Sequence, residues 1–122
     1  IAAVTQGRDW LKDFVRHLQA QSDYVVQRLA AWPGVKASPP QGTYVIFPDV
    51  RSLTTDSAAF CDHLRDRAKV ALVPGLPRWF GPGSEGHVRI CFATSRKILA
   101  EAFDRMEPVV AEFSPAGMAQ SR

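Results

Sequence analysis

The stretch HVRICFA at residues 87–93 alternates apolar side chains with other types, and this period of two is typical of a β-strand with one face in a core. The apolar face would carry Val88, Ile90 and Phe92. The opposite face would present Arg89 at the centre of the strand. Because a strand of this kind needs partners, the chain must fold around a small sheet with one apolar side.

The first part of the chain is predicted to be a long helix. Apolar side chains recur at steps of three and four through RDWLKDFVRHLQAQSDYVVQRLAAW, residues 8–32. Pro33 and Gly34 then end the helix. Residues 35–38 are a candidate short edge strand, and the PPQG segment that follows breaks the chain.

Two strands and a helix are expected in the middle of the chain. The segment TYVIF at residues 43–47 is β-branched or aromatic throughout, which predicts a strand closed by Pro48. A second helix is predicted to begin near Asp56. The segment VALV at residues 70–73 predicts another strand, ended by Pro74 and Gly75. The buried stripe of the second helix would be Phe60, Cys61, Leu64 and Ala68.

Residues 74–86 form a Gly- and Pro-rich loop, and loops of this length are often functional or mobile. The strand at 87–93 follows this loop. Thr94 or Ser95 is expected to cap a final helix, which Pro108 kinks or ends. Five apolar residues form the predicted buried stripe of this helix: Ile98, Leu99, Ala102, Phe103 and Met106.

Helices and strands mixed in this order predict an α+β fold, a small mixed sheet covered by helices. The two helices after the first would cover a common face of the sheet. The 122 residues are enough for one hydrophobic core. We therefore expect one domain over residues 1–113 and a flexible tail over residues 114–122.

The composition argues against several classes of function. The net charge is +3, and the basic residues alternate with acidic ones without an aromatic-interleaved stripe, which argues against nucleic acid as a partner. No apolar stretch reaches the ~20 residues of a membrane span. Because Cys61 and Cys91 form no CxxC pair, we expect reduced thiols, no metal site and a cytoplasmic protein.

Two interpretations of Arg89 stay open on the residues alone. The side chain could be exposed to solvent or paired with a nearby acid such as Glu85 or Asp49. Alternatively, it could bind the carboxylate of a ligand, because the planar guanidinium can donate two parallel hydrogen bonds to a carboxylate. The spacing of the residues does not decide between the two.

Four motifs in order resemble a known family: PPQGTYVIFPDV at 39–50, AKVALVPG at 68–75, FG at 80–81 and GHVRICFATS at 86–95. They are similar to the C-terminal small domain of fold-type I pyridoxal-phosphate enzymes, the class I/II aminotransferases. The similarity covers the chain up to about Met106, including the first helix. Any one motif is weak alone, but their order and spacing together make the resemblance specific.

The resemblance implies roles for several residues. In the family, the arginine of this last strand binds the α-carboxylate of the amino-acid or 2-oxo-acid substrate, and Arg89 is the matching residue. The loop before this strand runs along the active-site entrance, which implies that Phe80 and Gly81 lie near the substrate. Gly42 and Tyr44 belong to a GTY segment that resembles another part of the family's substrate pocket.

The resemblance also implies pyridoxal 5'-phosphate as the cofactor of the intact enzyme, transfer of an amino group between an amino acid and a 2-oxo acid as its reaction, and a homodimer as its assembly. In the family, the lysine that holds the cofactor precedes the small domain. The chain has four lysines: Lys12, Lys36, Lys69 and Lys97. None of them lies in a sequence context that matches the family's cofactor-binding lysine. The chain also begins IAAV, without methionine. We therefore expect a fragment without catalytic or cofactor-binding residues, which is inactive alone.

Two alternatives stay open. The chain could be a free-standing α+β module that binds a small carboxylate or a partner protein without chemistry. It could also be the small domain of a related fold-type I carbon–sulfur lyase or decarboxylase. In the family, the first helix packs against the large domain as well as the small sheet. The resemblance therefore implies that the wide apolar arc of this helix is left exposed in the fragment, where it would favour self-association. The residues that select the amino acid and the acceptor are expected mostly outside this chain.

Overall fold

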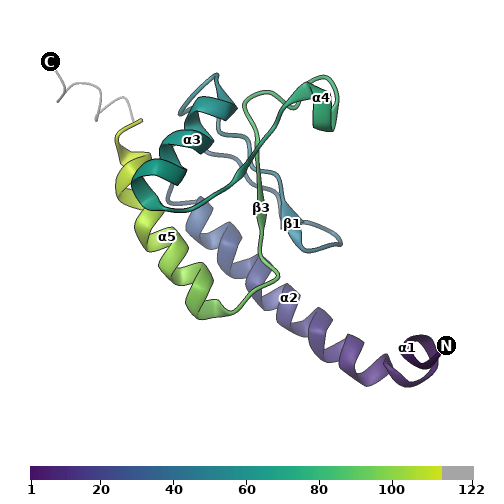
Figure 1. The fold of residues 1–122 in the computed structure, drawn as a ribbon. Helices are drawn as coiled ribbons and strands as arrows, with labels where there is room; N and C mark the ends of the chain where they lie inside the picture. The colour runs from purple at the N-terminus through teal and green to yellow at the C-terminus, as the bar shows by residue number, and fades with distance from the viewer. Residues whose placement is uncertain (114–122) are drawn as a thin grey trace, which may run out of the picture.

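The computed structural model describes residues 1–113, and the tail predicted at 114–122 lies outside the described residues. Figure 1 shows helices gathered around a small sheet. The predicted α+β class is confirmed. In chain order the elements are α1 (Ala2–Gln6), α2 (Arg8–Leu29), β1 (Val45–Ile46), α3 (Ser57–Ala68), β2 (Val73–Pro74), α4 (Pro77–Phe80), β3 (Val88–Cys91) and α5 (Arg96–Ala111).

The sheet has three strands in the order β1-β3-β2. Both pairings are antiparallel, with Ile46 opposite Ile90 and Val73 opposite Arg89. Within the described residues the sheet is thus antiparallel throughout rather than mixed. The loop between β2 and β3 turns the chain back on itself, because the Gly75 N–H donates to the His87 carbonyl at 2.8 Å, and this makes the two strands antiparallel neighbours.

The regular strands are shorter than predicted. The strand expected at 43–47 is reduced to β1, and the one expected at 70–73 begins only at Val73. Backbone pairing between these two segments nevertheless continues past β1, because the Val88 N–H donates to the Pro48 carbonyl at 3.2 Å. Pro48 has no N–H of its own to donate, which interrupts the regular ladder there.

The candidate edge strand at 35–38 forms one isolated bridge, between Lys36 and Asp49. The two backbones exchange hydrogen bonds of 3.2 and 2.9 Å at this bridge. Asp49 also pairs with His87 on its other side. The segment therefore ties the chain after α2 to the outer end of the sheet without forming a strand.

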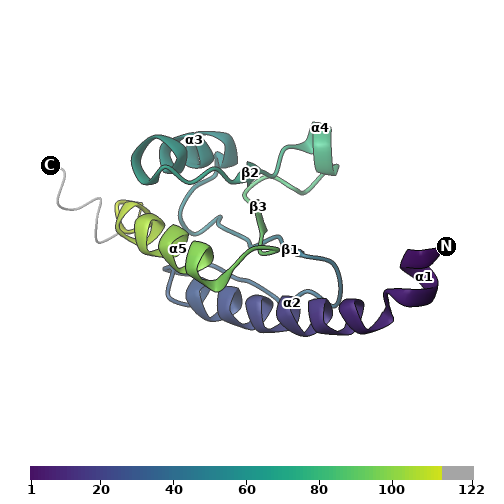
Figure 2. The ribbon, with the colours of Figure 1, turned by 60° about the horizontal axis from the view of Figure 1, so that its bottom comes forward.

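Helices α2, α3 and α5 cover the inner face of the sheet, with α5 between the other two in Figure 2. The strand alternation predicted for 87–93 is confirmed, since Val88 and Ile90 are buried while Arg89 and Cys91 are exposed. The predicted stripe of α3 is confirmed as well. Helix α2 contributes Val25 and Leu29 to the same core, so three helices cover the inner face.

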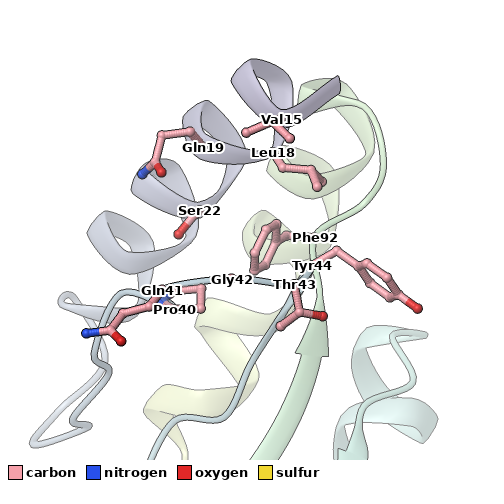
Figure 3. Close-up of a pocket in the computed structure, with 10 residues that line it drawn as sticks. All are labelled: Val15, Leu18, Gln19, Ser22, Pro40, Gln41, Gly42, Thr43, Tyr44 and Phe92. Atoms are coloured by element: carbon pink, nitrogen blue, oxygen red, sulfur yellow. The ribbon is translucent and has the colours of Figure 1, made fainter. Parts of the chain in front are cut away.

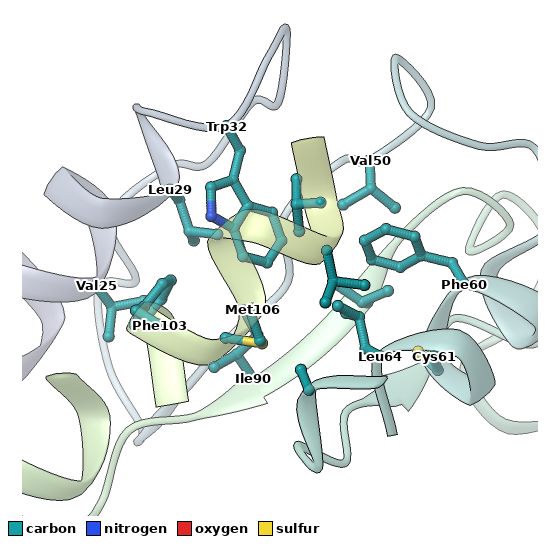
Figure 4. Close-up of a cluster of buried hydrophobic side chains, with 14 of the residues drawn as sticks. Val25, Leu29, Trp32, Val50, Phe60, Cys61, Leu64, Ile90, Phe103 and Met106 are labelled. Atoms are coloured by element: carbon teal, nitrogen blue, oxygen red, sulfur yellow. The ribbon is translucent and has the colours of Figure 1, made fainter. Parts of the chain in front are cut away.

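The centre of the core is aromatic, as Figure 4 shows. Phe60 of α3 and Phe103 of α5 are fully buried, and Trp32 lies between them with ring centroids 6.5 and 6.0 Å away. Aromatic pairs in such tilted or edge-to-face arrangements contribute about 0.5–1.5 kcal/mol each beyond the buried area. These contacts join helices α2, α3 and α5, because Trp32 lies three residues after the end of α2.

Helix α5 differs from its prediction in two places. Ser95 is the cap, accepting a hydrogen bond from the Ile98 N–H at 3.3 Å, but the Ile98 side chain is 57% exposed and does not belong to the buried stripe. Pro108 does not end the helix, which continues to Ala111. Proline removes one backbone hydrogen bond, and burial of Val109 and Val110 holds the last turn in place.

Only the C-terminal half of α2 packs on the core. Its buried residues begin at Gln21, whereas Trp10, Leu11 and Val15 are 68%, 53% and 54% exposed. Figures 1 and 2 show the N-terminal half of α2, together with α1, extending beyond the sheet. The predicted apolar periodicity is present, but the apolar side chains of this N-terminal half stay exposed within residues 1–113. None of the described helices is long and apolar enough to cross a membrane.

Candidate functional site

Arg89 lies at the centre of the outer face of the sheet. It belongs to β3, the middle strand, and Val73 of β2 is its direct partner on one side. On the other side, the register that pairs Ile46 with Ile90 places Phe47 opposite Arg89. The side chain is exposed. The sheet thus presents one guanidinium between two apolar neighbours.

No carboxylate of residues 1–113 lies within ion-pair distance of Arg89. Asp49, one of the two acids weighed as partners, is bound to Arg51 instead, with hydrogen bonds of 2.9 and 2.6 Å. These hydrogen bonds hold the pKa of the Asp49 carboxyl well below its usual range. Glu85, the other acid, makes no ion pair with Arg89. The arginine therefore keeps its donors available for a ligand.

The ring of Phe80 lies next to Arg89, with the guanidinium carbon 6.0 Å from the ring centroid. Phe80 ends α4, a single helical turn that the sequence analysis did not predict inside the loop 74–86. Pro77 at the first helical position and Gly81 after the last one were the signals for it. Gly81 has a φ of +88°, a backbone conformation that favours glycine. The structure thus brings two predicted site residues together, Arg89 and Phe80, and Gly81 follows Phe80 directly in the chain.

Phe47 is a residue of this site that the sequence analysis missed. Its ring centroid lies 5.1 Å from that of Phe80 and 5.2 Å from that of His87, stacked on the latter at an interplanar angle of 12°. Strand alternation contains the signal, since Phe47 and Arg89 share the outer face once β1 pairs with β3. We name Phe47, Phe80, His87 and Arg89 the outer-face cluster.

The loop that carries Phe80 is closed at its base by backbone contacts. The Gly75 N–H donates to the His87 carbonyl at 2.8 Å, and a Cβ at Gly75 would lie 2.1 Å from the Ser84 carbonyl oxygen. Only glycine fits at such a close approach. The Gly86 N–H donates to the buried Ser57 hydroxyl at 2.8 Å, which fixes the same end of the loop to α3.

Gly42 and Tyr44 form a second group, away from the outer-face cluster. The Tyr44 carbonyl accepts a hydrogen bond from the Phe92 N–H at 2.9 Å, so Tyr44 lies three positions along the strand from Arg89, roughly 10 Å at strand spacing. Figure 3 shows both residues at a pocket of about 200 Å³ between this segment and α2. Thr43 between them has a φ of +65°, which is strained for a β-branched residue.

None of the four lysines has the surroundings of a cofactor ligand. All four are exposed. Lys12 pairs with Asp9, and Lys69 donates to the Asp66 carbonyl. A lysine that reacts as an amine is normally desolvated or placed beside another cation. The described lysines therefore do not fit a covalently held cofactor.

The cysteines and the metal-binding residues offer no alternative site. Cys61 is buried, and this burial raises the pKa of its thiol to about 12. Cys91 is exposed on the outer face of β3. Within residues 1–113, no group of three or more His, Cys, Asp or Glu side chains is placed to hold a metal ion.

The chain is similar to known proteins in both sequence and fold. Residues 1–106 match the model of the family described as aminotransferase class I and II. The aspartate aminotransferase of Pyrococcus horikoshii is 33% identical over 109 residues, which are 88% of this chain and 27% of that protein. The chain thus spans about a quarter of the length of this relative.

Solved structures give the same result for the fold. An alanine aminotransferase from Pyrococcus furiosus superimposes with a TM-score of 0.82 at 33% identity, over 91% of this chain and 28% of that one. A pyridoxal-phosphate-bound C-S lyase from Staphylococcus hominis shares the fold, with a TM-score of 0.80 at 21% identity over 91% of this chain and 30% of that one. The matched family model and the similarity in sequence and fold establish that this chain belongs to the class I and II aminotransferase family.

Proposed function

We propose that residues 1–113 are the C-terminal small domain of an amino-acid aminotransferase, and that Arg89 binds the α-carboxylate of its substrate. The observation that carries the proposal is the exposed guanidinium at the centre of the outer face, which no acid of the described residues neutralises. An amino-acid or 2-oxo-acid substrate brings the complementary charge.

The geometry around Arg89 suits a carboxylate. The guanidinium can donate two parallel hydrogen bonds to the two carboxylate oxygens, and each charge-assisted bond contributes about 1.5–3 kcal/mol. Val73 and Phe47 flank the strand position of Arg89, and Phe80 covers part of the guanidinium. These apolar neighbours exclude water from one side of the ion pair, which strengthens it once the substrate is bound.

The loop with Phe80 and Gly81 is proposed to border the substrate entrance. Gly81 and Gly83 both have positive φ, and a Cβ at either one would meet no atom within 4 Å. The tip of the loop is therefore sterically open, whereas its base is fixed at Gly75. Such a loop can close over a substrate and hold its carboxylate in one orientation relative to the reacting carbon.

Pyridoxal phosphate would supply the electron-withdrawing chemistry that labilises the bond at the substrate α-carbon. Because the described lysines do not fit a cofactor ligand, we assign cofactor binding to the remainder of the parent protein. The exposed apolar half of α2 supports a parent in which further protein covers that helix. We propose a cytoplasmic location for this parent, since both cysteines are free thiols. We also propose a homodimer, which the family resemblance implies.

The test is the Arg89→Lys and Arg89→Leu pair in the full-length protein. L-aspartate and L-alanine serve as amino donors, with 2-oxoglutarate as acceptor. We expect KM for the donor to rise about tenfold in Arg89→Lys and more in Arg89→Leu, because a lysine cannot provide the bidentate contact. Arg105→Leu is the matched control, an exposed arginine of α5 that pairs with Glu101. An unchanged kcat/KM in both Arg89 variants would exclude this role.

A carbon–sulfur lyase is the second candidate, because the S. hominis lyase shares the fold. The products distinguish the two reactions. Transamination conserves the amino group. The donor is converted to a 2-oxo acid, and the acceptor receives the amino group. Elimination from L-cystathionine instead releases a thiol, ammonia and a 2-oxo acid. A non-catalytic carboxylate-binding module would give neither set of products.

A further inference from the structure

We propose that Phe47 is a positioning residue, which holds the Phe80 loop against the sheet and thereby orients Arg89 for the substrate carboxylate. This inference rests on the proposed function and adds a residue to it. The sequence motifs did not identify Phe47, and its role follows from the contacts that its ring makes in the folded chain.

The ring of Phe47 touches the loop at three points. At the base, its Cζ lies 3.1 Å from where a Cβ on Gly75 would stand. In the middle of the loop, its centroid is 5.1 Å from that of Phe80. At the end of the loop, it stacks on His87 at 5.2 Å and 12°. One side chain thus contacts the start, the middle and the end of a segment that projects from the sheet.

Phe47 is also the direct neighbour of Arg89 on the adjacent strand. The pairing of Ile46 with Ile90 places Phe47 opposite Arg89, and the hydrogen bond from the Val88 N–H to Pro48 continues this register. Phe47 therefore limits the space of the arginine from the side. Phe80, which lies 6.0 Å from the guanidinium carbon, limits it again and is itself packed on Phe47.

A purely structural role does not explain this placement. Phe47 is 38% exposed and is not one of the buried side chains that form the core. A phenylalanine that serves only the core is expected to be fully buried, as Phe60 and Phe103 are. The contacts of Phe47 are instead concentrated on the outer-face cluster.

The mechanism is a restriction of side-chain freedom. Within residues 1–113, Arg89 has no ion pair to fix its rotamer, so an arginine without neighbours would sample several orientations and lose entropy on binding. Packing of Phe47 against Phe80 reduces these orientations before the substrate arrives. Pre-organisation of this kind increases substrate affinity, because the entropic cost of ordering the arginine would otherwise reduce the binding free energy.

The experiment compares Phe47→Ala and Phe47→Leu with the wild type in the full-length protein, using L-aspartate and L-alanine as donors. We expect KM for the donor to rise about tenfold in Phe47→Ala while kcat changes by less than about twofold. Phe47→Leu retains bulk without the flat ring, so its KM should lie between the other two. Thermal unfolding is measured for each variant, so that a loss of folding is recognised.

A double-mutant cycle with Arg89→Leu tests whether Phe47 acts through the arginine. In the Arg89→Leu background, Phe47→Ala should raise KM by less than about twofold, because no guanidinium remains to be oriented. Ile98→Ala is the control, since Ile98 is an exposed apolar residue of α5, outside the outer-face cluster and outside the loop at 74–86.

The outcomes separate the two proposals. If Arg89→Leu raises KM but Phe47→Ala does not, the positioning role is wrong and the carboxylate role of Arg89 stands. If the effects of Phe47→Ala and Arg89→Leu on KM multiply fully in the double variant, Phe47 acts independently of Arg89 and the inference is overturned. If Arg89→Leu leaves KM unchanged, the proposed function and this inference both fail.

Discussion

The guanidinium carbon of Arg89 lies 6.0 Å from the ring centroid of Phe80, although the two residues belong to different parts of the chain. An arginine beside an aromatic face gains a cation–π attraction of about 0.5–1 kcal/mol when exposed. That is enough to bias the side chain and too little to compete with a carboxylate. Phe80 is thus a neighbour that Arg89 can keep while it binds an anion.

The central aromatic residue of α5 should carry much of the stability. Phe103 is fully buried against Trp32 and Tyr24, so Phe103→Ala should lower the free energy of unfolding by about 3–5 kcal/mol. Ile98→Ala on the same helix is the control, and it should cost less than about 0.5 kcal/mol because the side chain is exposed. Urea unfolding of the 122-residue chain, followed by circular dichroism, measures both. Equal losses would contradict the assigned core.

The Asp49–Arg51 pair predicts a loss of stability at low pH. Hydrogen bonds from Arg51 hold the pKa of Asp49 below its ordinary value of about 3.9. The pair therefore stabilises the folded state above that pH, and its contribution is lost as the pH falls and Asp49 is protonated. Asp49→Asn should lower Tm at pH 7 and show a smaller further drop in Tm between pH 6 and pH 3. An identical pH dependence of Tm in variant and wild type would contradict this assignment.

The two cysteines should differ sharply in reactivity. Burial raises the pKa of Cys61 to about 12, so the reactive thiolate is scarce at pH 8, whereas Cys91 is exposed. An excess of iodoacetamide should modify one thiol rapidly and the second only in denaturant, as read by mass spectrometry. Cys91→Ser should abolish the rapid reaction. Rapid labelling of Cys61 in the folded chain would show that α3 is not packed as described.

The 122-residue chain should neither transaminate nor hold pyridoxal phosphate covalently, because its described lysines are exposed and do not fit a cofactor ligand. Titration with the cofactor, followed by absorption and by mass spectrometry after borohydride reduction, measures this. Nonspecific reaction with surface lysines is the background, and free lysine at equal concentration serves as the control. A single site modified well above that background would contradict the prediction.

Much of the fold could be predicted because local signals agreed with the tertiary structure. Asp56 caps α3 as expected, accepting hydrogen bonds from the Ala58 and Ala59 N–H groups at 3.0 and 2.9 Å. The alternation around Arg89 is also as predicted. Where the signals failed, tertiary packing decided the outcome, since burial of Val110 carries α5 past Pro108.

The candidate site was only partly predictable. The resemblance to the aminotransferases identified Arg89 and Phe80, and the structure brings them together. It did not identify Phe47, whose place beside Arg89 depends on the register between β1 and β3. A register joins segments more than forty positions apart in the sequence, and no local pattern contains it. Gly42 and Tyr44 share a motif with Phe47 but lie at a separate pocket beside α2. The motif alone does not show which of its residues face α2 and which face Arg89.

The tight approach of Gly75 to the backbone opposite has a consequence for how this loop can change. Its base leaves no room for one more carbon atom, so insertions there would pull the strands apart. The tip between Gly81 and Gly83 meets no neighbours, so extra residues there would be accommodated without disturbing the sheet. Lineages of this protein can therefore diversify the length of the loop at its tip and still inherit an undisturbed Arg89.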